Sequence, residues 1–259
     1  MKKSKSRTKR FITRLFTITF TLIILVSSVM AYEYYPTVKA LYDDATIKVN
    51  DCSRDTFVNN SIALNNNQDK YLTFNDIPLY VKDAFIAIED RNFYNHGGIS
   101  AEAIFRACYS FIVNGGKITQ GGSTITQQLA RNVFLNFDKD YKRKIEEMFI
   151  AIKLEQKFTK NQILEFYINN INYSNGAYGI EAAAEKYFNK APKDLNLSQI
   201  CFLAAIPNDP TYYNPLKHSN NTLQRRDLIL KAMKENNYIT EAQYESAIKF
   251  KIELAAYNN

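Results

Sequence analysis

The feature that most constrains this chain is an uncharged, largely apolar run near its N-terminus, from Leu15 to Ala31. A helix that crosses a bilayer needs about 20 apolar residues, and Arg14 can extend its charged end out of the apolar layer. Tyr32 suits the membrane interface. We therefore expect one transmembrane signal-anchor over residues 15–32. The alternative is a cleaved signal peptide, because Val29-Met30-Ala31 resembles a small-residue cleavage site.

The positive charge of the chain is concentrated before this run. Of 33 Lys and Arg against 26 Asp and Glu, seven precede the run: Lys2, Lys3, Lys5, Arg7, Lys9, Arg10 and Arg14. The rest of the chain is formally neutral, whereas a nucleic-acid-binding domain would carry a basic patch. A basic tail at residues 1–14 indicates a cytoplasmic N-terminus, with everything beyond the anchor outside the cytoplasmic membrane.

Beyond the anchor, the pattern predicts a mainly α chain with few strands. Residues 33–74 are polar and Asn-rich and read as a stalk, and residues 75–250 read as one helical domain. Apolar spacing and capping residues predict helices at about 76–89, from Ser100, from Ser123 or Thr124, around Ile145, from Thr159, and at 178–189, 197–206, 221–235 and 240–250. With 2 His and 3 Cys, a His/Cys metal cage is hard to build.

An acidic pair, Glu89-Asp90, stands at the end of the first of these helices. The helix C-terminus carries partial negative charge, so it disfavours ionised carboxylates, which suits a group that accepts a proton. The alternative is that both side chains face solvent or pair with Arg91.

A second candidate site opens the helix after Gly121-Gly122. Ser123 and Thr124 lie at the helix N-terminus, where backbone N–H groups bind anions, and the polar segment Gln127 to Asn132 follows within two turns. A diphosphate would fit this surface. The alternative is an ordinary capped helix.

Lys139, Lys142, Arg143 and Lys144 crowd a later helix start, where the helix dipole disfavours cations. Such a cluster indicates an anionic ligand, and the alternative is a solvated face. The segment Ala103 to Val113 is apolar over more than one face, as in a buried core helix or a helix that dips into lipid.

Taken together, these segments resemble the peptidoglycan glycosyltransferases of family 51, the class that includes the glycosyltransferase domain of bifunctional penicillin-binding proteins. The resemblance rests on five ordered blocks: EDRNFYNHGG, GGSTITQQLARN, RKIEE, KNQILEFYIN with NGAYGIEAAAEKYF, and LSQICFLAAIPNDPTYYNP. It spans about residues 75–235 and implies a lysozyme-like helical fold with a small membrane-facing lobe. Since no penicillin-binding domain follows, the chain resembles the monofunctional form.

The resemblance implies a role for each motif residue. Glu89 would be the base that deprotonates the acceptor sugar, while Asp90, Phe93 and His96 would shape the acceptor side. The donor and its diphosphate would be held by Ser123, Thr124, Gln127, Gln128, Arg131, Arg143 and Lys144, with Gly122 and Asn132 as further substrate-binding positions. Glu147 would be a second catalytic carboxylate near the donor, where the family pattern allows a divalent cation, Mg or Mn.

The implied reaction polymerises lipid II into β-1,4-linked glycan with inversion and release of undecaprenyl diphosphate. Partners would be lipid II, the growing glycan strand, membrane lipid and other cell-wall synthesis proteins. The rivals are a lytic hydrolase on the same scaffold and a non-catalytic wall-assembly partner.

Four residues depart from the family pattern. Arg131 stands where Lys is common, Asn172 and Ser174 fall in the usual Ile-Tyr-Phe-Gly stretch, and Asn189 replaces a common Gly. These departures bear on rate or substrate preference more than on the type of reaction.

Overall fold

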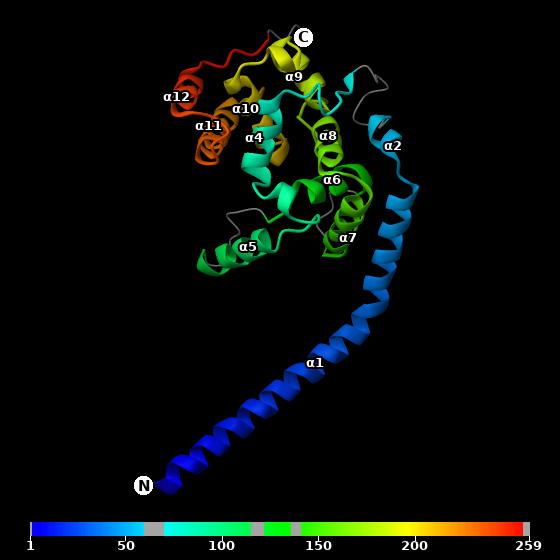
Figure 1. Ribbon diagram of the computed structural model, residues 1–259, viewed down its shortest axis with the longest axis vertical. Coiled ribbons are helices and arrows are strands. Elements are labelled where there is room, and N and C mark those ends of the chain that lie inside the picture. The colour runs from blue at the N-terminus through cyan, green and yellow to red at the C-terminus, as the bar shows by residue number, and fades with distance from the viewer. Residues whose placement is uncertain (1, 60–69, 115–121, 136–140, 256–259) are drawn as a thin grey trace. The chain divides into compact units, whose positions relative to one another are not determined.

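The computed structural model describes residues 2–59, 70–114, 122–135 and 141–255, and these residues are mainly helical (Figure 1). Within them the only β pairing is an isolated antiparallel bridge between Asn172 and Tyr178. The mainly α class predicted from the sequence is therefore confirmed. The chain divides into two compact units, Met1–Asp44 and Ala45–Asn259.

The first helix, α1 (Lys2–Asp51), contains the predicted anchor. Its part from Phe16 to Asp51 is long and apolar enough to cross a membrane, and its most apolar window has a mean hydropathy of 1.7 and no buried residues. The helix continues without a break through the first part of the segment predicted as a stalk. Its last residues, Ala45 and Val49, already belong to the core of the second unit, so that unit begins well before residue 75.

The second unit consists mainly of short helices with polar loops. The α-helices after α1 are α2 (Arg54–Val58), α4 (Leu79–Glu89), α5 (Ala101–Val113), α6 (Ile125–Phe134), α7 (Tyr141–Lys157), α8 (Lys160–Asn170), α9 (Ile180–Phe188), α10 (Leu197–Ala205), α11 (Ser219–Glu235) and α12 (Glu241–Lys249). Short 3₁₀ helices are η2 (Phe93–Asn95), η3 (Pro192–Asp194) and η4 (Ile206–Asn208).

The helix starts follow the capping residues of the sequence. Ser100 accepts a hydrogen bond from the backbone of Ala103, and Thr124, Thr159 and Thr240 each form a capping box with the Gln three residues later. Because each box satisfies two backbone N–H groups locally, a short sequence pattern is enough to set the boundary. The glycines expected to end α5, Gly115-Gly116, lie outside the described residues.

Two groups of helices meet in the core. On one side α4 packs against α10 and α11, and on the other α6 packs against α7 and α8 (Figure 1). Phe85 of α4 meets Tyr167 of α8 edge to face, with ring centroids 5.4 Å apart. Both rings are fully buried, and aromatic pairs of this geometry stabilise a core beyond the area they bury.

The segment that leads into α4 is bound to α8 through one buried carboxylate. Glu165 accepts hydrogen bonds of 2.8 Å each from Arg54, from the Tyr71 hydroxyl and from the backbone N–H of Phe74. The Asn169 side chain donates to and accepts from the backbone of Leu72. Residues of the predicted stalk are thus part of the folded unit.

Helix α5 presents large apolar side chains to solvent. Ile104, Phe105, Tyr109, Ile112 and Val113 are all exposed, with Phe105 at 72% and Ile112 at 76%. The alternative of a buried core helix is therefore wrong. α5 lies at the edge of the second unit (Figure 1), and the side chains of Ala107, Cys108 and Phe111 lie outside the described residues.

Candidate active site

The two carboxylates at the end of α4, Glu89 and Asp90, have different partners. α4 ends at Glu89, and Asp90 leaves the helix with an extended φ of −158°. Glu89 borders a cavity of about 550 Å³, and Asp90 also reaches the N-terminus of α6. The cavity is lined by Ala87, Ile88, Glu89, Asp90, Arg91, Arg106, Ser123, Gln128, Arg131, Asn208, Tyr213 and Arg225.

Glu89 is held by two donors from distant helices. Its carboxylate accepts hydrogen bonds from the Arg225 guanidinium at 2.7 Å and from the Gln128 amide at 2.8 Å. Its side chain is only 7% exposed, so the alternative in which it faces solvent or pairs with Arg91 is wrong. Because a carboxylate has about four acceptor positions, Glu89 keeps the capacity to accept a proton from a group in the cavity.

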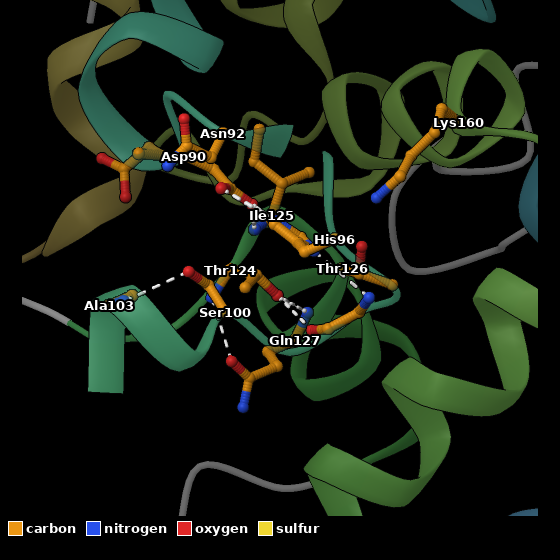
Figure 2. A network of polar contacts seen from close by, with 12 residues as sticks. Asp90, Asn92, His96, Ser100, Ala103, Thr124, Ile125, Thr126, Gln127 and Lys160 are labelled. Atoms are coloured by element: carbon orange, nitrogen blue, oxygen red, sulfur yellow. Dashed lines mark hydrogen bonds and ion pairs between the residues drawn. The ribbon is translucent and has the colours of Figure 1, made fainter. Parts of the chain in front are cut away.

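Asp90 serves as the anion at the N-terminus of α6 (Figure 2). One of its oxygens accepts from the backbone N–H of Ile125 at 3.1 Å, and both oxygens lie 2.9–3.0 Å from Nε2 of His96. The Gly98 N–H donates to Nδ1 of His96, so the imidazole proton is on Nε2 and points at Asp90. The anion site predicted at this helix start is therefore filled by the chain's own carboxylate.

Other predicted binding residues bond to one another around the same helix start. Thr124 and Gln127 are buried and form the capping box of α6, and the Thr124 hydroxyl donates to the carbonyl of Gly98 at 2.6 Å. Gly98 has a φ of +91°, and a Cβ there would lie 2.7 Å from the carbonyl oxygen of Ala151, so only glycine fits. These contacts fix the loop, and direct contact of Thr124 and Gln127 with substrate stays a prediction.

Phe93 and Asn132 are also held by the protein. Phe93 is fully buried, and the Lys160 ammonium lies 4.4 Å from its ring centroid. Asn132 donates to the backbone carbonyl of Gln128 within α6. Gly122 precedes Ser123 in the short loop that leads into this helix. A substrate contact for any of the three stays a prediction.

The predicted cationic cluster is organised by Glu147, which is fully buried. Arg143 pairs with it at 3.0 Å, and Lys144 pairs with its other oxygen and also donates to the Ser123 hydroxyl at 2.8 Å. Ser123 lines the cavity, so the cluster reaches the same site as Glu89. Lys142 is exposed, and Lys139 lies outside the described residues.

Glu147 does not have the surroundings of a metal ligand. Both of its oxygens already accept from cations, and among the described residues no three His, Cys, Asp or Glu side chains gather to hold an ion. The arrangement fits a buried carboxylate that positions Arg143 and Lys144. Glu147 is thus paired with two cations, and a Mg or Mn ion at the donor diphosphate stays a prediction.

Sequence reasoning missed five polar side chains of the cavity: Arg91, Arg106, Asn208, Tyr213 and Arg225. A signal for the last was present, because Arg225 lies four residues before the buried Ile229 and so on the core-facing side of α11. Its guanidinium lies 5.2 Å from the ring centroid of Tyr213. The Nε atoms of Arg131 and Arg225 are buried without a hydrogen-bond partner in the part of the chain that the structure describes.

Two carboxylates and four arginines line this cavity in a helical unit, an arrangement typical of proteins that bind anionic substrates. Comparison with protein families places it more closely: the transglycosylase family matches residues 56–234, and the chain belongs to that family.

Three relatives illustrate the similarity. The chain is 51% identical to penicillin-binding protein 1A of Aquifex aeolicus over 180 residues, covering 69% of this chain and 24% of the relative. It is 47% identical to penicillin-binding protein 1F of Bacillus subtilis over 176 residues, 68% of this chain and 24% of the relative. It is 39% identical to penicillin-binding protein 1A of Clostridium acetobutylicum over 258 residues, 92% of this chain and 32% of the relative. The chain therefore spans about a quarter to a third of their length.

Proposed function

We propose that this protein is a peptidoglycan glycosyltransferase that polymerises lipid II into β-1,4-linked glycan, with Glu89 as general base. The observation that carries the proposal is the cavity itself, which brings Glu89 together with Arg91, Arg106, Arg131 and Arg225. A hydroxyl nucleophile requires a proton acceptor, and a diphosphate leaving group requires cations that neutralise its charge. The cavity provides both.

On the acceptor side, Glu89 would take the proton of the attacking sugar hydroxyl. Arg225 and Gln128 hold its carboxylate in one orientation, so the base is positioned before the substrate arrives. Tyr167 donates to the Gln128 side-chain oxygen at 3.1 Å, which directs the amide N–H₂ toward Glu89.

On the donor side, the leaving diphosphate would be neutralised by guanidinium groups. These groups pair with phosphate oxygens through two parallel hydrogen bonds. Arg131 and Arg225 each have a buried Nε without a partner among the described residues, which a phosphate oxygen would satisfy. Lys144 would extend this cationic surface through its contact with Ser123. No step in this scheme uses a metal ion.

A lipid-linked substrate also explains the apolar surfaces. α1 would cross the cytoplasmic membrane once, with the basic tail inside and the catalytic unit outside. The exposed apolar side chains of α5 would enter the outer lipid layer, where the lipid chain of the substrate resides.

A lytic hydrolase fits this site less well. Enzymes of that kind use one carboxylic acid, often with a second carboxylate on the other side of the scissile bond. Both Asp90 and Glu147 are engaged, the first by His96 and Ile125 and the second by Arg143 and Lys144. Glu89 and Asp90 both line the cavity, but Asp90 is bound to the N-terminus of α6 and to His96, so we assign the base to Glu89.

The test is polymerisation of lipid II by the full-length chain in detergent, comparing wild type with Glu89→Gln. Loss of a general base lowers the rate about 10²- to 10⁴-fold. Glu245→Gln, which changes an exposed carboxylate on α12, is the matched control and should retain full activity. Wild-type turnover by Glu89→Gln would remove Glu89 from its role, and release of short sugars from preformed wall would favour the hydrolase.

A further inference from the structure

Glu102, in the first turn of α5, gathers three donors on one carboxylate. It accepts from Arg91 at 2.5 Å, from the Asn92 amide at 2.5 Å and from Arg106 at 2.6 Å. Arg91 and Asn92 follow α4, whereas Arg106 lies one turn further along α5. The carboxylate therefore joins α5 to the segment after α4 through Arg91 and Asn92, and it pairs with Arg106 within α5.

Those two guanidinium groups are part of the cavity wall. Arg91 and Arg106 both line the cavity that contains Glu89, while Glu102 does not. A carboxylate and a phosphate bind guanidinium through the same donor atoms and with the same geometry. An anion that entered the cavity would therefore meet two arginines already paired with an acidic group of the protein.

The pairing is weak enough to exchange with a ligand. Side-chain exposures of Arg91, Glu102 and Arg106 are 52%, 47% and 34%, and ion pairs this exposed contribute little net free energy. Hydrogen bonds from Arg91 and the charges of both arginines lower the pKa of Glu102, so its carboxylate is ionised at neutral pH. A diphosphate carries more charge and more acceptor oxygens, so it can displace the carboxylate.

We propose that Glu102 is a built-in counter-ion that competes with the substrate diphosphate for Arg91 and Arg106 and thereby sets the affinity of the site. This inference rests on the proposed function, because it takes a diphosphate as the anionic ligand. In the ligand-free enzyme Glu102 pairs with the two arginines. When the diphosphate binds, both arginines leave Glu102 and pair with phosphate oxygens.

Competition and positioning by Glu102 have opposite consequences. If Glu102 only oriented the arginines for the ligand, its removal would weaken binding of the diphosphate. If it competes with the ligand, its removal tightens binding, because the arginines no longer have to leave a partner. The sign of the change in affinity therefore separates the two roles.

The experiment measures binding of inorganic pyrophosphate to the full-length chain in detergent by calorimetry, and the steady-state kinetics of lipid II polymerisation. Glu102→Gln should lower the dissociation constant of pyrophosphate roughly two- to five-fold, with a smaller difference at high salt. It should also lower KM for lipid II without raising kcat. Glu185→Gln is the matched control, since Glu185 forms an exposed ion pair with Lys70 outside the cavity, and it should change neither quantity.

The other outcomes of the two measurements would count against either the role of Glu102 or the proposed function. Weaker or unchanged pyrophosphate binding by a folded Glu102→Gln variant would overturn the competition, as would the absence of measurable binding in both forms. Failure of the wild type to polymerise lipid II would instead count against the proposed function, and pyrophosphate affinity would still decide the role of Glu102.

Discussion

Asp90→Asn separates a structural role for this carboxylate from the acceptor-binding role that the family resemblance implies. In the native fold both Asp90 oxygens are acceptors, one for the Ile125 N–H and both for the His96 Nε2–H. Asparagine offers one acceptor and one donor. If its oxygen faces Ile125, its N–H₂ faces the His96 N–H, and the other imidazole tautomer would instead oppose the Gly98 N–H.

The size of the effect follows from these contacts. One buried donor left without an acceptor costs about 1–3 kcal/mol. Loss of a partly buried anion from the N-terminus of α6 costs up to about 2 kcal/mol more. We expect Asp90→Asn to lower the free energy of unfolding by about 2–4 kcal/mol. For a unit the size of Ala45–Asn259, a loss near 3 kcal/mol lowers Tm by about 6–12 °C.

The assay is thermal and urea unfolding of the full chain in detergent, followed by near-UV circular dichroism. Glu241→Gln is the control, because Glu241 is also an acidic residue in a first helical turn but is exposed, and it should change stability by less than about 0.5 kcal/mol. An Asp90→Asn protein as stable as the control, yet defective in polymerisation, would refute the structural role and favour direct contact with the acceptor.

Two further predictions concern stability. Glu165→Ala should lower the free energy of unfolding by about 3 kcal/mol, because three donors lose their buried acceptor; limited proteolysis should then cleave before α4, and a wild-type digestion pattern would contradict this. Ser174→Gly should raise the free energy of unfolding by about 1 kcal/mol, because Ser174 has a φ of +69°, which glycine adopts without strain. Asn172→Ala should lower it by about 1 kcal/mol, because the Asn172 side chain accepts the Ser174 N–H at 2.7 Å. Urea unfolding measures both changes, and stabilities equal to that of the wild type would show that the turn is unstrained.

The last pair explains one departure from the family pattern. At the position where the family resemblance implies glycine, Ser174 adopts the left-handed conformation, and the Asn two residues earlier provides an acceptor that stabilises the turn. Asn189 replaces another glycine at the C-terminus of α9 with a φ of +51°, a conformation that Asn tolerates better than most residues. Local backbone geometry therefore accommodates both Ser174 and Asn189, and both residues lie outside the cavity.

Features that depend on neighbours in the sequence could be predicted. The capping boxes at Thr159 and Thr240, the helix cap at Ser123 or Thr124, and the end of α4 at Glu89 all rest on contacts within one or two turns. The motif blocks, through their resemblance to a known family, also indicated Glu89 as the central carboxylate. Such patterns are visible without tertiary structure because the interacting atoms are a few residues apart.

The partners of the charged groups could not be predicted, because they come from distant segments. Arg225 is 136 residues from Glu89, and Asp90 is 35 residues from the N–H of Ile125 that it accepts from. Sequence alone determined most of the helices between residues 76 and 250 and which residue types are present near Glu89. Only the tertiary structure decided that Asp90 fills the α6 N-terminus, that Glu147 is enclosed by cations and that Glu102 pairs with two arginines of the cavity wall. The physical reason is that a charge takes whichever opposite charge the packed fold brings within hydrogen-bonding distance.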